Sequence, residues 1–299
     1  MQKLVVVLGP TAVGKTNFAI KLAKEFSGEI ISADSRQVYK GMDIGTGKDL
    51  DEYQIDDLNI PYYLIDIIEP DYEYNLFSFQ KDFNSSFNHI ISNNNLPFLV
   101  GGTGLYIHSI LKDYNLLDAD FNSQRAKDLV LLDKSELLKI LNTSKSKLHN
   151  TTDLVNKERI IKAILISEAD NKKEEPRVNI NPLVIGIAET REIIKQRITN
   201  RLKLRLQNGM IEEVENLIRN GISYERLELF GLEYRHISYY IKGELSYNDM
   251  YQKLNSAIHK FAKKQMTWFR KMEREGIEIN WLKSDETHKA NLLIKNFLQ

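Results

Sequence analysis

A glycine-rich loop near the N-terminus constrains the fold more than any other part of this sequence. Gly9-Pro-Thr-Ala-Val-Gly-Lys-Thr16 matches the pattern G-x-x-x-x-G-K-[ST] in full, and it directly follows the apolar run Leu4–Leu8. Apolar residues then recur at helical spacing over Thr16–Phe26. The order strand, tight turn, helix predicts a phosphate-binding loop and an α/β fold.

Each residue type in this loop has a chemical reason. The backbone N–H groups of a glycine-rich turn converge on phosphate oxygens, and the N-terminus of the following helix adds its dipole. Lys15 supplies a positive charge, and the hydroxyl of Thr16 can hold Mg²⁺. The loop therefore predicts a phosphorylated ligand without saying which one.

Apolar runs alternate with helical patterns through the first hundred residues. The predicted strands are Leu4–Leu8, Glu29–Ser32, Tyr62–Ile65, Pro97–Val100 and, later in the chain, Pro182–Ile187. The predicted helices between them are Thr16–Phe26 and Phe77–Ile91. Such alternation predicts a parallel sheet flanked by helices, as in P-loop NTPases, with ligands at the carboxyl ends of the strands.

The segment 112–181 has a different character. Glycine is absent, and apolar positions recur at helical spacing from Leu129 to Leu141 and again over Val155–Ser167, before a charged linker at Glu168–Pro176. We predict a small helical insertion domain here, and a catalytic core made of residues 1–111 and 182–299. The core ends in a helical C-terminal region, with long helices predicted at Arg191–Asn208, Ile211–Asn220 and Tyr247–Arg274.

The net charge of zero hides an uneven distribution. Residues 1–100 hold 8 basic and 14 acidic side chains, whereas residues 189–274 hold 17 basic and 11 acidic ones. The basic segment suits a polyanion partner, although solvated helix faces would explain it as well. The chain has no cysteine, its six histidines are scattered, and no apolar run reaches the ~20 residues of a membrane span. We expect a cytoplasmic enzyme.

Two further strand ends carry residues suited to chemistry. Asp34 follows the second strand and could be a general base, an indirect Mg²⁺ ligand or a helix cap. Thr103, in the glycine-rich turn Gly101–Gly104, could donate to a leaving-group oxygen, unless the turn only packs a helix against the sheet. Arg197, Arg201 and Arg205 share one helix face.

The motifs appear in an order that resembles the tRNA dimethylallyltransferase family. They are Gly9–Thr16, Ile31–Thr46 with its Asp34-Ser-Arg-Gln, Pro61–Asp66, Val100–Tyr106 and Lys264–Arg270, with a weaker similarity at Asn156–Ala163. Lys260–Arg270 interleaves basic and aromatic side chains, which suits RNA but also an ordinary amphipathic helix. The resemblance covers nearly the whole chain.

The resemblance implies transfer of a dimethylallyl group from its diphosphate to N6 of the adenosine on the 3′ side of a tRNA anticodon. Asp34 would take the proton, Thr103 would contact the bridging oxygen, and Arg197 would neutralise the leaving diphosphate. The diphosphate would be bound by Gly9, Thr11, Ala12, Gly14, Lys15 and Thr16, with Mg²⁺ at Thr16. Contacts to tRNA would come from Ser35, Gln37, Tyr39, Arg235, Lys264, Gln265 and Arg270. The insertion domain would grip the anticodon stem-loop.

Other functions stay open at this point. A P-loop kinase of small molecules or nucleotides would share the loop at Gly9–Thr16, a related enzyme could prenylate a free adenine nucleotide, and a paralogue could bind RNA without catalysis. The sequence departs from the family at Glu233, where glycine is usual, and in its short insertion. The bulk and negative charge of Glu233 are expected to disfavour close approach of an RNA backbone beside Arg235. A monomer is expected, and nothing in the sequence indicates a protein partner.

Overall fold

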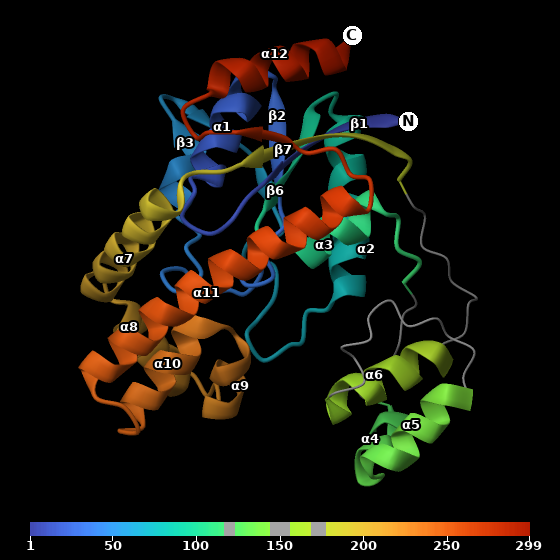
Figure 1. Ribbon diagram of the computed structural model, residues 1–299, viewed down its shortest axis with the longest axis vertical. Helices are drawn as coiled ribbons and strands as arrows, with labels where there is room; N and C mark the ends of the chain where they lie inside the picture. The colour runs from blue at the N-terminus through green and yellow to red at the C-terminus, as the bar shows by residue number, and fades with distance from the viewer. Residues whose placement is uncertain (117–122, 144–155, 169–177) are drawn as a thin grey trace. The chain divides into compact units, whose positions relative to one another are not determined.

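The computed structural model describes residues 1–116, 123–143, 156–168 and 178–299 (Figure 1). The chain divides into two compact units, Met1–Asp113 with Arg177–Gln299, and Tyr114–Pro176. These bounds lie near the predicted limits of the insertion at residues 112 and 181. The predicted linker Glu168–Pro176 lies outside the described residues except for Glu168, which ends a helix.

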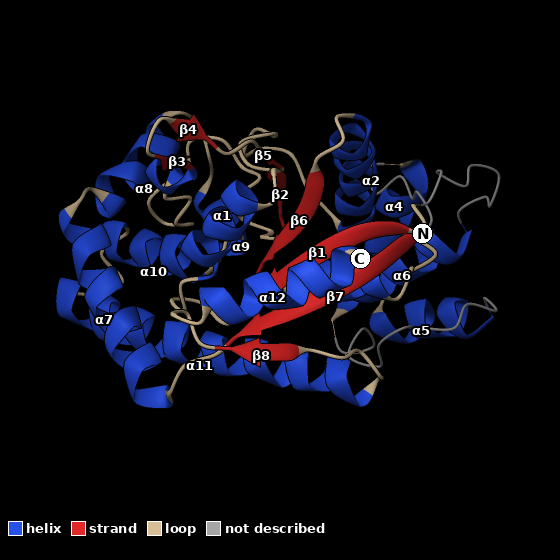
Figure 2. Cartoon of the chain, turned by 90° about the horizontal axis from the view of Figure 1, so that it is seen from above, coloured by secondary structure: helices blue, strands red, loops and turns tan. Residues whose placement is uncertain are grey.

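The larger unit is built on a six-stranded parallel sheet, whose strands lie side by side in Figure 2. Its strands are β1 (Gln2–Leu8), β2 (Gly28–Ser32), β5 (Tyr62–Tyr63), β6 (Leu96–Gly101), β7 (Ile180–Ile187) and β8 (Asn280–Leu282). Their order across the sheet is β5-β2-β6-β1-β7-β8. The predicted fold class, a parallel α/β sheet with flanking helices, is confirmed.

Helices cover both faces of this sheet, which explains why its central strands are continuous apolar runs. The helices α2 (Leu76–Ser92), α3 (Gly104–Leu111) and α11 (Tyr247–Arg274) pack with Leu4, Val6 and Leu8. The helices α1 (Lys15–Glu25) and α12 (Thr287–Leu298) pack with Val5 and Val7 on the opposite face. Successive residues of β1 therefore point to alternate faces, and both are buried.

A helical layer follows β7 and forms its own apolar cluster. It contains α7 (Arg191–Gln207), α8 (Met210–Arg219), α9 (Tyr224–Leu229), α10 (Leu232–Ile241) and part of α11. The sequence predicted α7, α8 and α11 but not α9 and α10. The six-residue helix α9 is too short for a clear apolar period, and it begins at a cap in which the Ser223 hydroxyl accepts from the Arg226 N–H.

The predicted strand Tyr62–Ile65 was too long. The strand β5 ends at Tyr63 because Leu64 and Asp66 adopt positive φ angles of 63° and 55°, which a strand cannot hold. A short helix, η1 (Leu50–Tyr53), and a two-stranded hairpin precede it. The hairpin consists of β3 (Gln54–Ile55) and β4 (Leu58–Asn59).

The smaller unit is helical, with α4 (Gln124–Leu131), α5 (Lys134–Thr143) and α6 (Lys157–Glu168) around a core that includes Leu129, Leu137 and Ile164. The apolar pattern from Leu129 to Leu141 is not one helix, as the spacing suggested, but two. Asp133 separates them with a capping box: its carboxylate accepts from the Glu136 N–H, and the Glu136 carboxylate accepts from the Asp133 N–H. Among the described residues no helix combines the length and apolar content that a membrane span needs.

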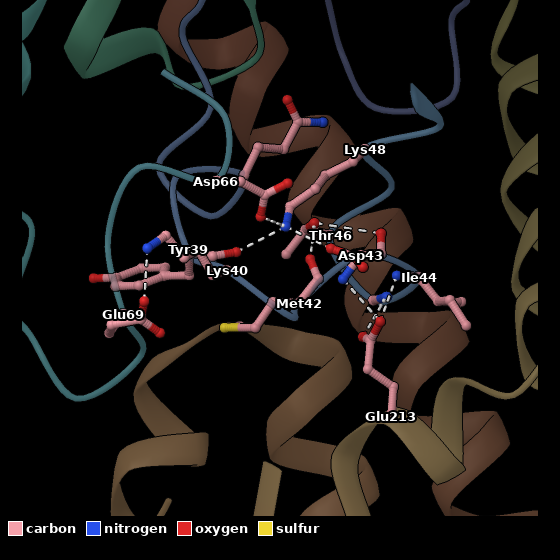
Figure 3. A network of polar contacts seen from close by, with 12 residues as sticks. Tyr39, Lys40, Met42, Asp43, Ile44, Thr46, Lys48, Asp66, Glu69 and Glu213 are labelled. Carbon is pink, nitrogen blue, oxygen red and sulfur yellow. Dashed lines mark hydrogen bonds and ion pairs between the residues drawn. The ribbon is translucent and has the colours of Figure 1, made fainter. Parts of the chain in front are cut away.

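A buried lysine holds the loop that follows β2. Lys48 is 1% exposed, and its ammonium donates to the Tyr39 carbonyl at 2.8 Å, to Asp43 at 2.6 Å and to Asp66 (Figure 3). Glu213 of α8 accepts from the backbone N–H groups of residues 43–45 of the same loop. Hydrogen bonds and ion pairs of charged side chains therefore fix the loop 39–48, which lies outside the helices and strands.

Replacing Lys48 with methionine should lower the free energy of unfolding by ~1–3 kcal/mol, because Asp43, Asp66 and the Tyr39 carbonyl lose a buried charged donor. Urea unfolding followed by circular dichroism measures it. The matched control is Lys40→Met, since Lys40 forms an exposed pair with Glu69 that is expected to contribute under ~1 kcal/mol. Equal effects of the two variants would contradict this interpretation.

Candidate active site at the carboxyl edge of the sheet

Three loops meet at the carboxyl ends of β1, β6 and β2, which are neighbours in the sheet. The loop after β1 is Gly9–Gly14, the loop after β2 carries Asp34, and the turn after β6 carries Thr103. The Ser35 N–H donates to the Thr103 hydroxyl at 3.1 Å, and the Thr103 N–H donates to the Ala33 carbonyl at 3.1 Å. The structure thus brings together the three segments that the sequence singled out.

The first loop has the shape of an anion site. Gly14 is the N-cap of α1 in the left-handed conformation, at φ 92°, and no side chain caps the helix. The N–H groups of its first turn are therefore available to an anion, which the helix dipole also favours. The Lys15 ammonium folds back and donates to the Pro10 carbonyl at 2.9 Å. Thr16 follows in the first turn of α1.

Two arginines of α7 contact this loop, Arg201 and the Arg197 that the sequence favoured. Arg201 of α7 donates to the hydroxyl of Thr11, inside the loop. Arg197 lies one turn away, donates to the Val13 carbonyl at 3.2 Å and approaches Glu189 at 3.9 Å, with 43% of its side chain exposed. The spacing of four residues predicts that both arginines lie on one helix face. The contacts that each of them makes depend on tertiary packing.

Burial and mutual repulsion lower the pKa values of two cationic side chains in this site. Burial, with a smaller effect of the Arg201 charge, lowers the pKa of Lys15 to about 8, against a raising effect of Asp34. Burial and the Arg205 charge lower the pKa of Arg201 to about 10. Both cations would gain from a polyanionic ligand, because it would offset the cost of holding positive charges close together and away from water.

Gln265 of α11 connects two of the loops. Its side-chain oxygen accepts from the Thr11 N–H at 2.8 Å, and its side-chain nitrogen donates to the Gly102 carbonyl at 2.9 Å. A Cβ on Gly102 would lie 2.4 Å from that nitrogen, so only glycine admits the contact. The sequence predicted that Gln265 contacts tRNA. Its amide is buried and engaged within the protein, and a contact to tRNA stays a prediction.

Three other predicted tRNA contacts are also engaged internally. The Gln37 side chain bonds to Ser32 and to the Gly47 carbonyl. The hydroxyl of the buried Tyr39 accepts from the Tyr74 N–H, and the Arg235 guanidinium donates twice to the Glu228 carbonyl. These side chains bond within the protein, and their contacts to tRNA stay predictions as well. Ser35 lies beside Thr103, while Lys264 and Arg270 are exposed on α11, so their tRNA contacts stay predictions.

Glu233, the residue that departs from the family pattern, lies beside the site. Burial raises the pKa of its carboxyl group, whereas the charges of Arg205 and Arg201 act in the opposite direction. Its carboxylate oxygen lies 4.0 Å from the position that a Cβ on Gly231 would occupy. The charges that act on Glu233 are thus those of the arginines of α7 and of Asp34, and its effect on RNA approach beside Arg235 stays a prediction.

Among the described residues, no group of three or more His, Cys, Asp or Glu side chains could hold a metal ion. A Mg²⁺ ion that binds with a diphosphate needs only one or two protein ligands, because diphosphate oxygens and water fill the other positions. The hydroxyl of Thr16, at the start of α1, has the chemistry for such a ligand.

Comparisons with known proteins agree with this geometry. The sequence matches the family described as IPP transferase over residues 37–272 and the family described as Isopentenyl transferase over residues 2–63. It is 51% identical over 283 residues to tRNA dimethylallyltransferase 1 of Geotalea uraniireducens (strain Rf4), covering 94% of this chain and 93% of the relative. It is 50% identical over 293 residues to tRNA dimethylallyltransferase 1 of Azobacteroides pseudotrichonymphae genomovar. CFP2, covering 97% and 95%.

Solved structures give the same picture. The full-length tRNA isopentenylpyrophosphate transferase from Bacillus halodurans superimposes with a TM-score of 0.71 at 30% identity, covering 100% of this chain and 96% of that one. A eukaryotic dimethylallyltransferase acting on tRNA superimposes with a TM-score of 0.75 at 21% identity, covering 100% and 78%. The second likeness supports the fold alone.

The pKa of Lys15 predicts how diphosphate affinity changes with pH. Below pH ~8 the ammonium is charged in the free protein, whereas above that pH binding must be accompanied by proton uptake. The dissociation constant of an alkyl diphosphate should therefore rise by up to ~10-fold per pH unit between pH 8 and 9.5. Titration calorimetry measures it. A Lys15→Met variant should bind weakly without this dependence, and a flat wild-type profile would contradict the assignment.

The side-chain amide of Gln265, which bridges two loops, leads to a second prediction. Gln265→Leu leaves the Thr11 N–H and the Gly102 carbonyl unpaired, so it should lower the free energy of unfolding by ~1–3 kcal/mol and weaken diphosphate binding. Gln265→Glu keeps the acceptor for Thr11 and should recover part of the affinity. Lys263→Leu, at an exposed position two residues earlier, is the control. Wild-type diphosphate affinity in Gln265→Leu would show that the bridge does not position the loop.

Proposed function

The chain belongs to the IPP transferase family, and from this membership we propose that it transfers a dimethylallyl group from dimethylallyl diphosphate to N6 of the adenosine on the 3′ side of a tRNA anticodon. It is a prenyltransferase enzyme of tRNA modification. The observation that carries the detailed proposal is the convergence of Lys15, Arg201, Asp34 and Thr103 at one edge of the sheet.

The leaving diphosphate would bind to the loop after β1. The first-turn N–H groups of α1, Lys15 and Arg201 together present positive charge to it, with Arg197 further out. As the bond between C1 and the bridging oxygen breaks, the electron pair stays on the diphosphate. Cations already in place stabilise that developing charge without reorganisation.

Asp34 is suited to act as the base. One carboxylate oxygen accepts from the Arg36 N–H at 2.9 Å, which orients the group on its own loop. N6 would attack C1 of the donor, and Asp34 would take the proton that N6 loses. The Thr103 hydroxyl accepts from the Ser35 N–H, so its own hydrogen can be directed to the bridging oxygen.

Mg²⁺, held by Thr16 and the diphosphate, would supply further neutralisation of the leaving group. The acceptor must leave the stack of the anticodon loop to reach Asp34, and unstacking costs a few kcal/mol that protein contacts must offset. The basic side chains of residues 189–274, Lys264 and Arg270 among them, are suited to the RNA phosphates. The smaller unit is proposed to grip the anticodon stem-loop, and the cytoplasm is the expected location.

Replacing Asp34 with asparagine keeps the size of the side chain but removes the base. Transfer of labelled dimethylallyl diphosphate to an unmodified tRNA should fall by ~10²–10⁴-fold, while tRNA binding remains. Asp57→Asn, at an exposed position, is the control for loss of a carboxylate. Near-normal turnover in Asp34→Asn would overturn the assignment of the base.

The same assay tests the reaction class. Wild-type protein should label tRNA and leave AMP unlabelled. Label in AMP alone would make a free nucleotide the acceptor, and hydrolysis of ATP with no prenyl transfer would point to the kinase alternative.

A further inference from the structure

The guanidinium of Arg197 contacts two acceptors of the protein itself. It donates to the Val13 carbonyl at 3.2 Å and lies 3.9 Å from a carboxylate oxygen of Glu189. The side chain of Arg197 is 43% exposed, whereas that of Glu189 is only 9% exposed. The arginine proposed to neutralise the leaving diphosphate therefore has a largely buried carboxylate beside it, to which the proposed reaction gives no role.

Glu189 lies at the same edge of the sheet as the loop after β1. It stands two residues beyond the end of β7, and β7 pairs with β1 in parallel, so that both strands end at this edge. It also stands two residues before the start of α7, and the N-terminus of a helix favours negative charge. The fold thus places a carboxylate beside the loop that is proposed to bind an anion.

A hydroxyl from the neighbouring strand end holds the same carboxylate. Ser284 stands two residues beyond β8, which pairs with β7, and its hydroxyl donates to Glu189 at 2.8 Å. The Cβ of Ser284 lies 3.7 Å from the point that a Cβ on Gly14 would occupy, so Ser284 packs against the loop after β1. Glu189 therefore keeps one hydrogen bond when Arg197 moves away from it.

The carboxylate of Glu189 and a bound diphosphate would compete for one guanidinium. The same oxygen of Glu189, Oε1, takes part in the contacts with Ser284 and with Arg197. A diphosphate at the first turn of α1 would attract Arg197 with charged oxygens of its own, since guanidinium groups are suited to phosphate. The contact with Glu189 would then be weakened or lost, and its loss would reduce the net gain from binding the diphosphate.

We propose that Glu189 is a positioning residue that competes with the diphosphate for Arg197 and thereby limits how tightly the released diphosphate is held. The proposal rests on the proposed function, since it takes the loop after β1 to bind diphosphate with Arg197 beside it. Cations that stabilise a leaving group also retain it afterwards, and product release limits the turnover of many enzymes. Glu189 takes Arg197 back as the diphosphate leaves, and Ser284 supplies a hydrogen bond to Glu189 while Arg197 is on the diphosphate.

The first test measures binding of inorganic pyrophosphate by titration calorimetry, with Mg²⁺ at one fixed concentration. Glu189→Gln keeps the size of the side chain and an acceptor for Ser284 but removes the charge. It should lower the dissociation constant by ~3–10-fold, as expected for release of an arginine from one partly buried ion pair. Damage to the fold would raise the constant instead. The matched control is Glu192→Gln, at an exposed position in the first turn of α7, which should change the constant by less than ~2-fold.

The second test determines whether the effect depends on Arg197. Arg197→Met should raise the dissociation constant for pyrophosphate, and adding Glu189→Gln to this variant should change the constant by less than ~2-fold, because the two side chains are coupled. An equal gain of affinity in both backgrounds would mean that the carboxylate only repels the diphosphate through space. Ser284→Ala removes the other partner of Glu189, so Glu189 should hold Arg197 more strongly and the dissociation constant should rise by ~2–3-fold.

Three results would overturn the proposal: unchanged or weaker pyrophosphate binding by Glu189→Gln, an equal gain of affinity in the Arg197→Met background, or unchanged or tighter binding by Ser284→Ala. Circular dichroism confirms that the variants fold. Prenyl transfer to tRNA by the wild type together with any of these results would leave the proposed function standing and remove the role of Glu189. The expected binding pattern without prenyl transfer would support the competition for Arg197 and contradict the function.

Discussion

The side chain of Gln265 joins the loop after β1 to the turn after β6. Through its amide, the loop at Thr11 and the turn at Gly102 become one unit with α11. The glycines of that turn are needed for this contact, since Gln265 and Trp268 occupy the space that a Cβ at Gly102 or Gly104 would fill. The proposed base belongs to the same unit, because Thr103 bonds to the loop of Asp34. A helix at the far end of the chain thereby sets the spacing between leaving group and base.

The hydrogen bonds between these loops matter because the site contains cationic side chains that repel one another. The pKa values of Lys15 and Arg201 are both lowered by burial and by neighbouring cations, so the empty site holds its positive charge at a cost. A flexible site would relax by turning these side chains toward water. In this site the Pro10 carbonyl and the Thr11 hydroxyl hold them in place, and the proposed diphosphate would offset the cost on binding.

The sequence predicted the sheet well because its signal is local, and the signal for the first loop is of the same kind. A buried parallel strand is a continuous apolar run, and the phosphate loop needs its glycines and its lysine at fixed spacing. The helix Tyr247–Arg274 was predicted with its exact ends, since Ser246 caps a long amphipathic pattern. The individual roles of Gln37, Tyr39, Arg235 and Gln265 were not predictable in this way. An amide, a hydroxyl or a guanidinium serves the fold or a ligand equally well, and only tertiary contacts decide which.

Glu233, at a position where the family usually has glycine, also affects the charges of this site. Its carboxylate faces the arginines of α7 on one side of Gly231, and Arg36 approaches Gly231 at 3.7 Å. If Glu233 were glycine, Arg201 would lose the carboxylate that raises its pKa most, and Asp49 and Asp34 would offset less of its charge. The carboxylate of Glu233 therefore offsets part of the positive charge that Arg201 and Arg205 bring to this side of the proposed site.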